Sequence, residues 1–168
     1  MHKCSRMEEA YKERRSAMLF YSIAVLTFML DQATKWLIRR NLEIGDSFPW
    51  GPFQISRYEN SGMAGSLFQG YGTLFGIAAL LFVVAILYYR GTLEKKRILL
   101  EASFGLLVGG AAGNGIDRLL FGRVTDFLVR SGGILNVADH AIEAGVLLLL
   151  IHSALNWLKR LAIKEWKN

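Results

Sequence analysis

The chain has 168 residues, 52% of them hydrophobic, and a formal net charge of +6 at pH 7. This length suits one domain, and the apolar content exceeds that of an ordinary soluble protein. A single cysteine, Cys4, excludes an internal disulfide framework and any metal cluster built from cysteines. We therefore expect a single integral-membrane domain over residues 1–168.

Several segments are long and apolar enough to cross a bilayer, which takes about 20 mostly apolar residues. The first of them is interrupted by Asp31 and Lys35, and the third carries Glu101 near its start. The spans are expected at about residues 17–38, 71–89, 98–121 and 137–158.

Lysine and arginine gather in segments that four such spans would place on one side of the membrane. These segments are the N-terminal tail, the link RGTLEKKR between the second and third spans, and the C-terminal tail. Because short basic segments face the cytoplasm, we expect both termini on that side. Topology then explains the basic excess, so we expect no nucleic-acid partner.

The long loop at about residues 39–70 should lie on the outer side. It contains FQISRY, which is typical of a short strand, and nearby glycines and prolines indicate turns. Its aromatic residues, Phe48, Trp50, Phe53 and Tyr58, would suit the membrane interface. The sequence therefore predicts an all-α membrane protein with four transmembrane helices and a small β-containing extracytoplasmic platform.

The third span carries Gly105, Gly109 and Gly113 at four-residue spacing. Small residues at this spacing allow helix backbones to approach closely in lipid. The pattern predicts tight helix packing and a compact bundle.

Polar residues from separate parts of the chain converge at the outer ends of the spans. Ionisable groups within spans are costly, and they usually face a bundle interior or an aqueous cavity. The direction of each span places all of these groups near the outer surface, either at helix ends or in the outer loops. They are Asp31, Lys35, Asn60, Gly62, Asn114, Asp117, Arg118, Asp126, Asn136 and Asp139.

Each of these features also has a simpler explanation. Asn136 could cap the fourth helix, with Asp139 favoured by the positive helix N-terminus. Asp31 and Lys35 could form only an intrahelical ion pair, and other polar residues could pair with interface charges. Their coincidence at one depth instead favours a shared polar site.

Carboxylates are the most abundant reactive groups at this predicted site. A Ser-Lys pair drawn from Lys35 with Ser61 or Ser66 has no support from spacing, and a zinc site would need more histidines than His140. Two neighbouring aspartates cannot both ionise easily, so one can act as a base on water while the other polarises a carbonyl. Asp126 and Asp139 are the best such pair.

The ordered motifs resemble those of the prolipoprotein signal peptidase family, also called signal peptidase II. The matching segments are DQATK at 31–35, NSGMA at 60–64, NGIDR at 114–118, VTDF at 124–127 and NVAD at 136–139. Each motif alone is weak, but several in order are specific, and the resemblance covers nearly the whole chain.

The resemblance implies an aspartic intramembrane endopeptidase without metal or cofactor, in the bacterial cytoplasmic (inner) membrane, with its site toward the outer leaflet. Its substrate would be a diacylglyceryl-modified prolipoprotein, cut just before the lipidated cysteine. Other implied contacts are membrane lipid and globomycin-type cyclic peptides as inhibitors, and we expect a monomer.

The resemblance also assigns roles by motif position. Asp126 and Asp139 would be the catalytic pair. The other residues would bind substrate or support the site: Asn60, Asn114, Arg118 and Asn136 by holding substrate backbone or ordering the pair, and Asp31, Lys35, Gly62 and Asp117 by supporting it.

The chain departs from the family pattern at two positions. Gly65 stands where the family usually has an aromatic residue, and Leu135 where it usually has phenylalanine. These departures leave open a non-catalytic lipoprotein-binding paralogue. A small proton-coupled transporter is the other alternative, because buried carboxylates also mark proton paths.

Overall fold

The structure, a computed structural model, describes residues 2–62, 67–93 and 97–166. Gly65 and Ala64 of the outer loop and Lys95 and Lys96 of the basic link lie outside the described residues. Within the described part, four helices and a four-stranded sheet form, which confirms the predicted fold class. The helices are α1 (His2–Asn41), α2 (Gly72–Thr92), α3 (Ile98–Phe121) and α4 (Val137–Trp166).

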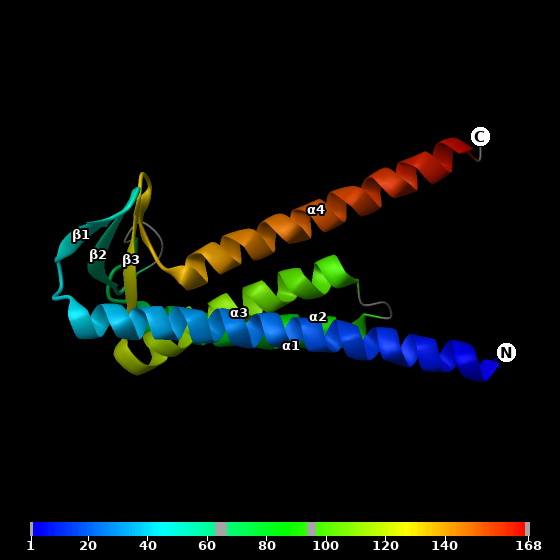
Figure 1. Cartoon of the computed structure of the whole chain (residues 1–168), viewed down its shortest axis with the longest axis horizontal. Helices are drawn as coiled ribbons and strands as arrows, with labels where there is room; N and C mark the ends of the chain where they lie inside the picture. Colours follow the sequence, from blue (N-terminus) through cyan, green and yellow to red (C-terminus); the bar gives the residue numbers. More distant parts are fainter. Residues whose placement is uncertain (1, 63–66, 94–96, 167–168) are drawn as a thin grey trace.

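All four helices include a stretch long and apolar enough to cross a membrane. Helices α1 and α4 continue well past their apolar segments, because the charged stretches there are rich in good helix formers such as Glu, Lys, Arg and Ala. Both helices project beyond α2 and α3 at the end of the bundle where the termini lie, and the sheet occupies the opposite end (Figure 1).

The sheet is antiparallel with strand order β1-β2-β3-β4. Strand β2 contains the predicted FQISRY segment. The second outer loop forms a hairpin that was not predicted from the sequence, although VTDFLV is rich in strand formers. The strands are β1 (Ser47–Trp50), β2 (Phe53–Asn60), β3 (Val124–Arg130) and β4 (Gly133–Leu135). The β2–β3 pairing joins the two outer loops into one platform and sets Tyr58 opposite Asp126.

Helix α3 is the centre of the bundle. In its most apolar stretch 72% of the residues are buried, against 11–17% for the other three helices. Its glycines make the contact with α1. A Cβ atom at Gly105 would lie 2.9 Å from the Phe20 carbonyl oxygen, and one at Gly109 would lie 2.6 Å from that of Ala24. The predicted tight packing is confirmed for these helices.

Helix α4 packs closely against α3 over its first half. A Cβ atom at Gly110 would lie 2.6 Å from the Ala138 carbonyl oxygen, and Ser103 donates a hydrogen bond to the Gly145 carbonyl. Beyond that contact α4 diverges from α3 toward its C-terminus (Figure 1). The expected compactness therefore holds for α1, α2 and α3 and for the part of α4 nearest the sheet.

Replacing Gly109 with alanine should destabilise the protein. The added methyl group cannot fit against the Ala24 carbonyl, so α1 and α3 must separate, at a cost of about 1–3 kcal/mol in unfolding free energy. Gly91→Ala is the matched control, because a Cβ atom there meets nothing within 4 Å. Thermal unfolding of both variants in detergent measures the difference. Equal unfolding midpoints would show that the glycine contact is not needed.

Candidate active site

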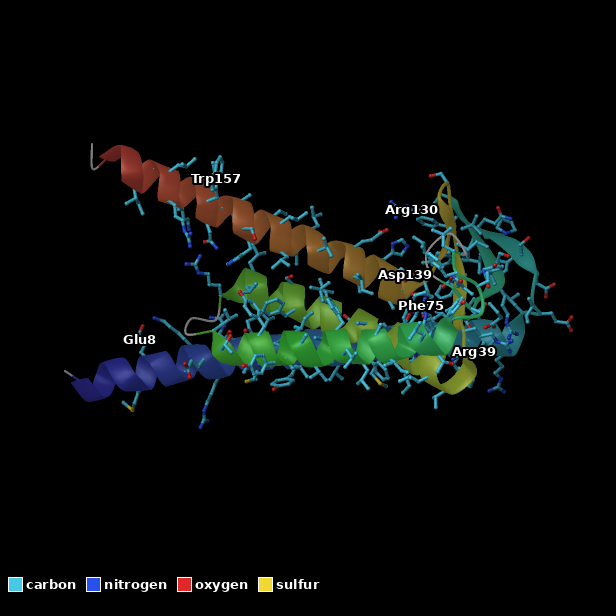
Figure 2. The ribbon with its side chains drawn as sticks, turned by 180° about the vertical axis from the view of Figure 1, so that it is seen from behind. Glu8, Arg39, Phe75, Arg130, Asp139 and Trp157 are labelled. Carbon is cyan, nitrogen blue, oxygen red and sulfur yellow. The ribbon has the colours of Figure 1, made fainter. Side chains whose placement is uncertain are left out.

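Asp126 and Asp139 approach each other from different kinds of element. Asp126 lies on β3 and is 3% exposed, while Asp139 lies in the first turn of α4. Figure 2 shows Asp139 where the start of α4 meets the sheet. The charge of Asp139 acts on Asp126. The two carboxylates are therefore close enough to repel each other.

Side-chain amides hold both carboxylates. Asn60 donates to Asp126 Oδ2 over 3.0 Å, and Asn136 donates to Asp126 Oδ1 over 2.6 Å. Asn114 donates to Asp139 Oδ1 over 2.8 Å. The Asn136 amide nitrogen also lies 3.1 Å from Asn114 Oδ1, so the amides bond to one another as well as to the acids. The arrangement fixes the orientation of each carboxylate.

Asn136 and Asp139 form a reciprocal cap at the start of α4. The backbone N–H of Asp139 donates to Asn136 Oδ1 over 3.0 Å, and the backbone N–H of Asn136 donates to Asp139 Oδ2 over 3.0 Å. This is the capping-box geometry, which satisfies donors left free at a helix N-terminus. Asn136 and Asp139 therefore cap α4, as the simpler explanation expects, and they also belong to the shared polar site.

A fully buried ion cluster lies next to the amides. The Lys35 amine is 2.7 Å from Asp31 Oδ2, 3.0 Å from Asp117 Oδ2 and 2.7 Å from Asn114 Oδ1. Lys35, Asp31 and Asp117 each have 0% exposure. Asp31 Oδ1 also accepts a hydrogen bond from the Ala138 backbone N–H over 2.9 Å, which ties α1 to the start of α4. The expected ion pair on α1 is therefore part of a larger network.

Two side chains of this network on α1 were not predicted from the sequence. Arg39 lies 3.5 Å from Asp117 Oδ1 and donates to Thr125 beside Asp126, so two cations balance two buried carboxylates. Gln32 donates to the Gly113 carbonyl oxygen over 3.1 Å. The spacing of Asp31, Lys35 and Arg39 at four-residue intervals was a usable signal for Arg39. Gln32 carries no charge to mark it.

Arg118 reaches from α3 to the outer loop. Its NH2 group donates to the Gly62 carbonyl oxygen over 2.9 Å, and the Gly62 backbone N–H donates to Asn60 Oδ1 over 2.9 Å. The Arg118 Nε atom is buried and has no hydrogen-bond partner among the described residues. A guanidinium N–H at this position is free to donate to a bound molecule.

A cavity of about 20 Å³ lies among these groups. A water molecule needs at least about 10–15 Å³ of such space together with several polar partners, so the cavity fits one water. Both aspartates line it. The complete lining is Asn60, Asn114, Arg118, Asp126, Ile134, Leu135, Asn136 and Asp139. Leu135, one of the departures from the family pattern, therefore borders the same cavity as the aspartates.

The pKa of Asp126 is raised to about 6. Burial is the largest cause, because it penalises the charged carboxylate, and repulsion from Asp139 adds to it. The hydrogen bonds from Asn60 and Asn136 act in the opposite direction. Asp126 is thus the member of the pair whose environment favours the protonated form.

All residues predicted for the site are brought together by the fold. Asn60, Asn114, Arg118, Asp126, Asn136 and Asp139 line one cavity, and Gly62 bonds to two of them. Lys35 bonds to Asn114 and pairs with Asp31 and Asp117. Their individual roles stay predictions. Over the described ranges, no three His, Cys, Asp or Glu side chains are placed to hold a metal ion together.

The sequence matches the family described as Signal peptidase (SPase) II over residues 23–155. The chain is 39% identical over 149 residues to a lipoprotein signal peptidase of Bacillus pumilus (strain SAFR-032), with 84% of this chain and 96% of that protein covered. It is 36% identical over 146 residues to a lipoprotein signal peptidase of Bacillus subtilis (strain 168), with 83% and 95% covered.

Two solved structures, each described as a bacterial membrane enzyme determined by the in meso method, share the fold. One, at 2.3 Å resolution, has a TM-score of 0.77 and 32% identity, covering 82% of this chain and 88% of that one. The other, at 1.9 Å, has a TM-score of 0.72 and 33% identity, covering 79% and 90%. The chain therefore belongs to the signal peptidase II family and is a bacterial multi-pass membrane protease.

Proposed function

We propose that this chain is an aspartic endopeptidase that removes the signal peptide from diacylglyceryl-modified prolipoproteins by cutting before the lipidated cysteine. The observation that carries the aspartic mechanism is the cavity for one water between Asp126 and Asp139. The substrate class is supported by the name of the relatives, lipoprotein signal peptidase. No metal or cofactor takes part in the proposed reaction.

The reaction uses the aspartates in different protonation states. Asp139, ionised, takes a proton from the water, whose oxygen attacks the carbonyl carbon of the scissile peptide. Asp126, protonated, gives its proton to the carbonyl oxygen, which avoids a charged intermediate in a buried site. The diol intermediate collapses as Asp139 passes its proton to the leaving nitrogen and Asp126 recovers one from a hydroxyl. The assignment rests on the raised pKa of Asp126.

The surrounding polar groups position the aspartates and the substrate. Asn60, Asn114 and Asn136 orient the carboxylates through the hydrogen bonds described above. The free Nε–H of Arg118 is the donor best placed to bind a substrate carbonyl. Globomycin-type cyclic peptides would compete with the substrate for these donors.

The proposed membrane orientation puts the aspartates toward the outer leaflet. Its support is the position of the basic tails, which lie at the end of the bundle opposite the sheet (Figure 1). The transporter alternative gains nothing from the fold. Glu101, the span carboxylate far from the sheet, is neutralised by Arg90 at 2.8 Å rather than left to carry protons.

Replacing either aspartate should stop cleavage. Asp126→Asn removes the proton donor and Asp139→Asn removes the base, so each should lower kcat/KM by at least about 100-fold. Cleavage of a purified diacylglyceryl prolipoprotein, with and without globomycin, measures this. Asp46→Asn is the matched control, because Asp46 is an exposed turn residue. Near-normal activity in either site variant, in a protein that still inserts and unfolds like wild type, would disprove the aspartic mechanism.

The pH dependence of kcat/KM should report the loss of the proton from Asp126. Protonated Asp126 is present below its pKa of about 6 and is lost as the pH rises through that value. The kcat/KM of the free enzyme should therefore fall as the pH rises above about 6. The same substrate assayed in steps between pH 5 and 8.5 tests this. A profile that stays flat, or that rises throughout this interval, would contradict Asp126 as the proton donor.

Lys35→Met should destabilise the folded protein and reduce cleavage. The substitution leaves Asp31 and Asp117 buried with only Arg39 to balance them, and breaking a buried ion pair costs about 3–5 kcal/mol. The exposed pair of Lys12 with Glu8 provides the control, because Lys12→Met should change the unfolding midpoint little. Equal midpoints in the two variants would contradict a supporting role for Lys35.

A further inference from the structure

A large cavity lies at the end of the bundle opposite the sheet. Its volume is about 760 Å³. Residues on successive turns of α1 line it, together with residues at the start of α3. None of its lining residues borders the cavity between the aspartates. It has two chemical halves. Lys12, Arg15 and Arg97 supply positive charge at one end, and Met18 and Leu19 supply apolar surface further along α1.

A buried hydroxyl at this cavity lacks a partner. Ser16 is 5% exposed, lines the cavity, and its Oγ atom has no hydrogen-bond partner among the described residues. A helical serine usually satisfies its hydroxyl by bonding to a carbonyl one turn back. A hydroxyl left unpaired and buried costs free energy, so an acceptor supplied by a bound molecule would stabilise this position.

The start of α3 also favours a bound molecule whose hydrogen-bond acceptor carries negative charge. Helix α3 begins at Ile98, and Arg97, its N-cap residue, makes no side-chain cap hydrogen bond but donates through one guanidinium nitrogen to Asn156 of α4. Helix N-termini carry partial positive charge and unpaired N–H groups, which favour anions. The acidic residue in the first turn, Glu101, is already paired with Arg90. Glu8 pairs with Lys12 on the part of α1 that projects beyond α2 and α3 (Figure 2).

The depth of the cavity matches a lipid headgroup. Ser16 precedes Lys35 by 19 positions on one continuous helix, which is about 28 Å at about 1.5 Å per residue. The hydrocarbon core of a bilayer is about 30 Å thick. With Lys35 beside the proposed active site at one interface, Ser16 lies at the other, where phosphate groups and the first carbons of acyl chains occur.

We propose that this cavity binds one anionic phospholipid of the leaflet opposite the active site. Arg15 and Arg97 would hold the phosphate, the Ser16 hydroxyl would donate to a phosphate oxygen, and one acyl chain would lie along Met18 and Leu19. The binding is independent of the proposed peptidase reaction, because it uses none of the site residues.

The test is lipid titration of the purified full-length protein, followed by native mass spectrometry. Dioleoylphosphatidylglycerol should bind with one saturable site, and dioleoylphosphatidylcholine should not. Ser16→Ala removes a hydrogen bond to a charged group without changing the net charge, so the dissociation constant for phosphatidylglycerol should rise about tenfold. Arg15→Gln, at an exposed position, should raise it by about tenfold or more.

Matched controls separate a built site from general attraction. Arg14→Gln removes the same charge one position away and outside the cavity lining, and Ser153→Ala removes an exposed hydroxyl on α4. Both should leave the constant within about twofold. The proposal fails if Arg14→Gln weakens binding as much as Arg15→Gln while Ser16→Ala has no effect. It also fails if sodium phosphate alone occupies the site with the affinity of the lipid, since the ligand would then be a free anion.

Discussion

The amine of Lys35 is a charge buried inside a bundle that lipid surrounds, and the arrangement of the other helices follows from satisfying it. Three oxygen atoms surround it within 3.0 Å, one from α1 and two from α3. To reach them, α3 must lie almost in backbone contact with α1. Gly113 permits this, because a Cβ atom there would be 2.5 Å from Asp31 Oδ2. The glycines of α3 therefore allow the close helix approach that brings these oxygen atoms to the buried Lys35 amine.

The same cluster extends to the groups proposed to perform catalysis. Asn114 accepts from Lys35 through its carbonyl oxygen and donates to Asp139 through its amide nitrogen. This bonding fixes which end of the amide faces the aspartate, since an ammonium can only donate. Asp31 fixes the start of α4 through the Ala138 backbone. The position of Asp139 thus depends on buried charges that do not themselves line the cavity.

The convergence of polar residues could be predicted because a charge inside an apolar span is costly and must face the bundle interior or an aqueous cavity. Asp31, Lys35 and Asp117 are charges of this kind, and Asn114 is a neutral polar group under the same constraint. Arg39 was missed because it falls just past the expected end of the first span, where an arginine also suits the interface. The β3–β4 hairpin was missed for a different reason: strand pairing depends on β2, which lies far away in the sequence. The contact of Arg118 with Gly62 depends on a loop conformation that no local pattern specifies.

The hydrogen bond from Ala138 to Asp31 joins residues 107 positions apart. It therefore matters for the order in which the chain is made. When only the first three spans have been made, Asp31 has Lys35 on its own helix but lacks its donor on α4. Asp139 is absent at that stage, because it belongs to the last helix to be synthesised. A nascent chain shorter than 139 residues cannot hold both aspartates, so proteolytic capacity would arise only after the start of the last helix has been made.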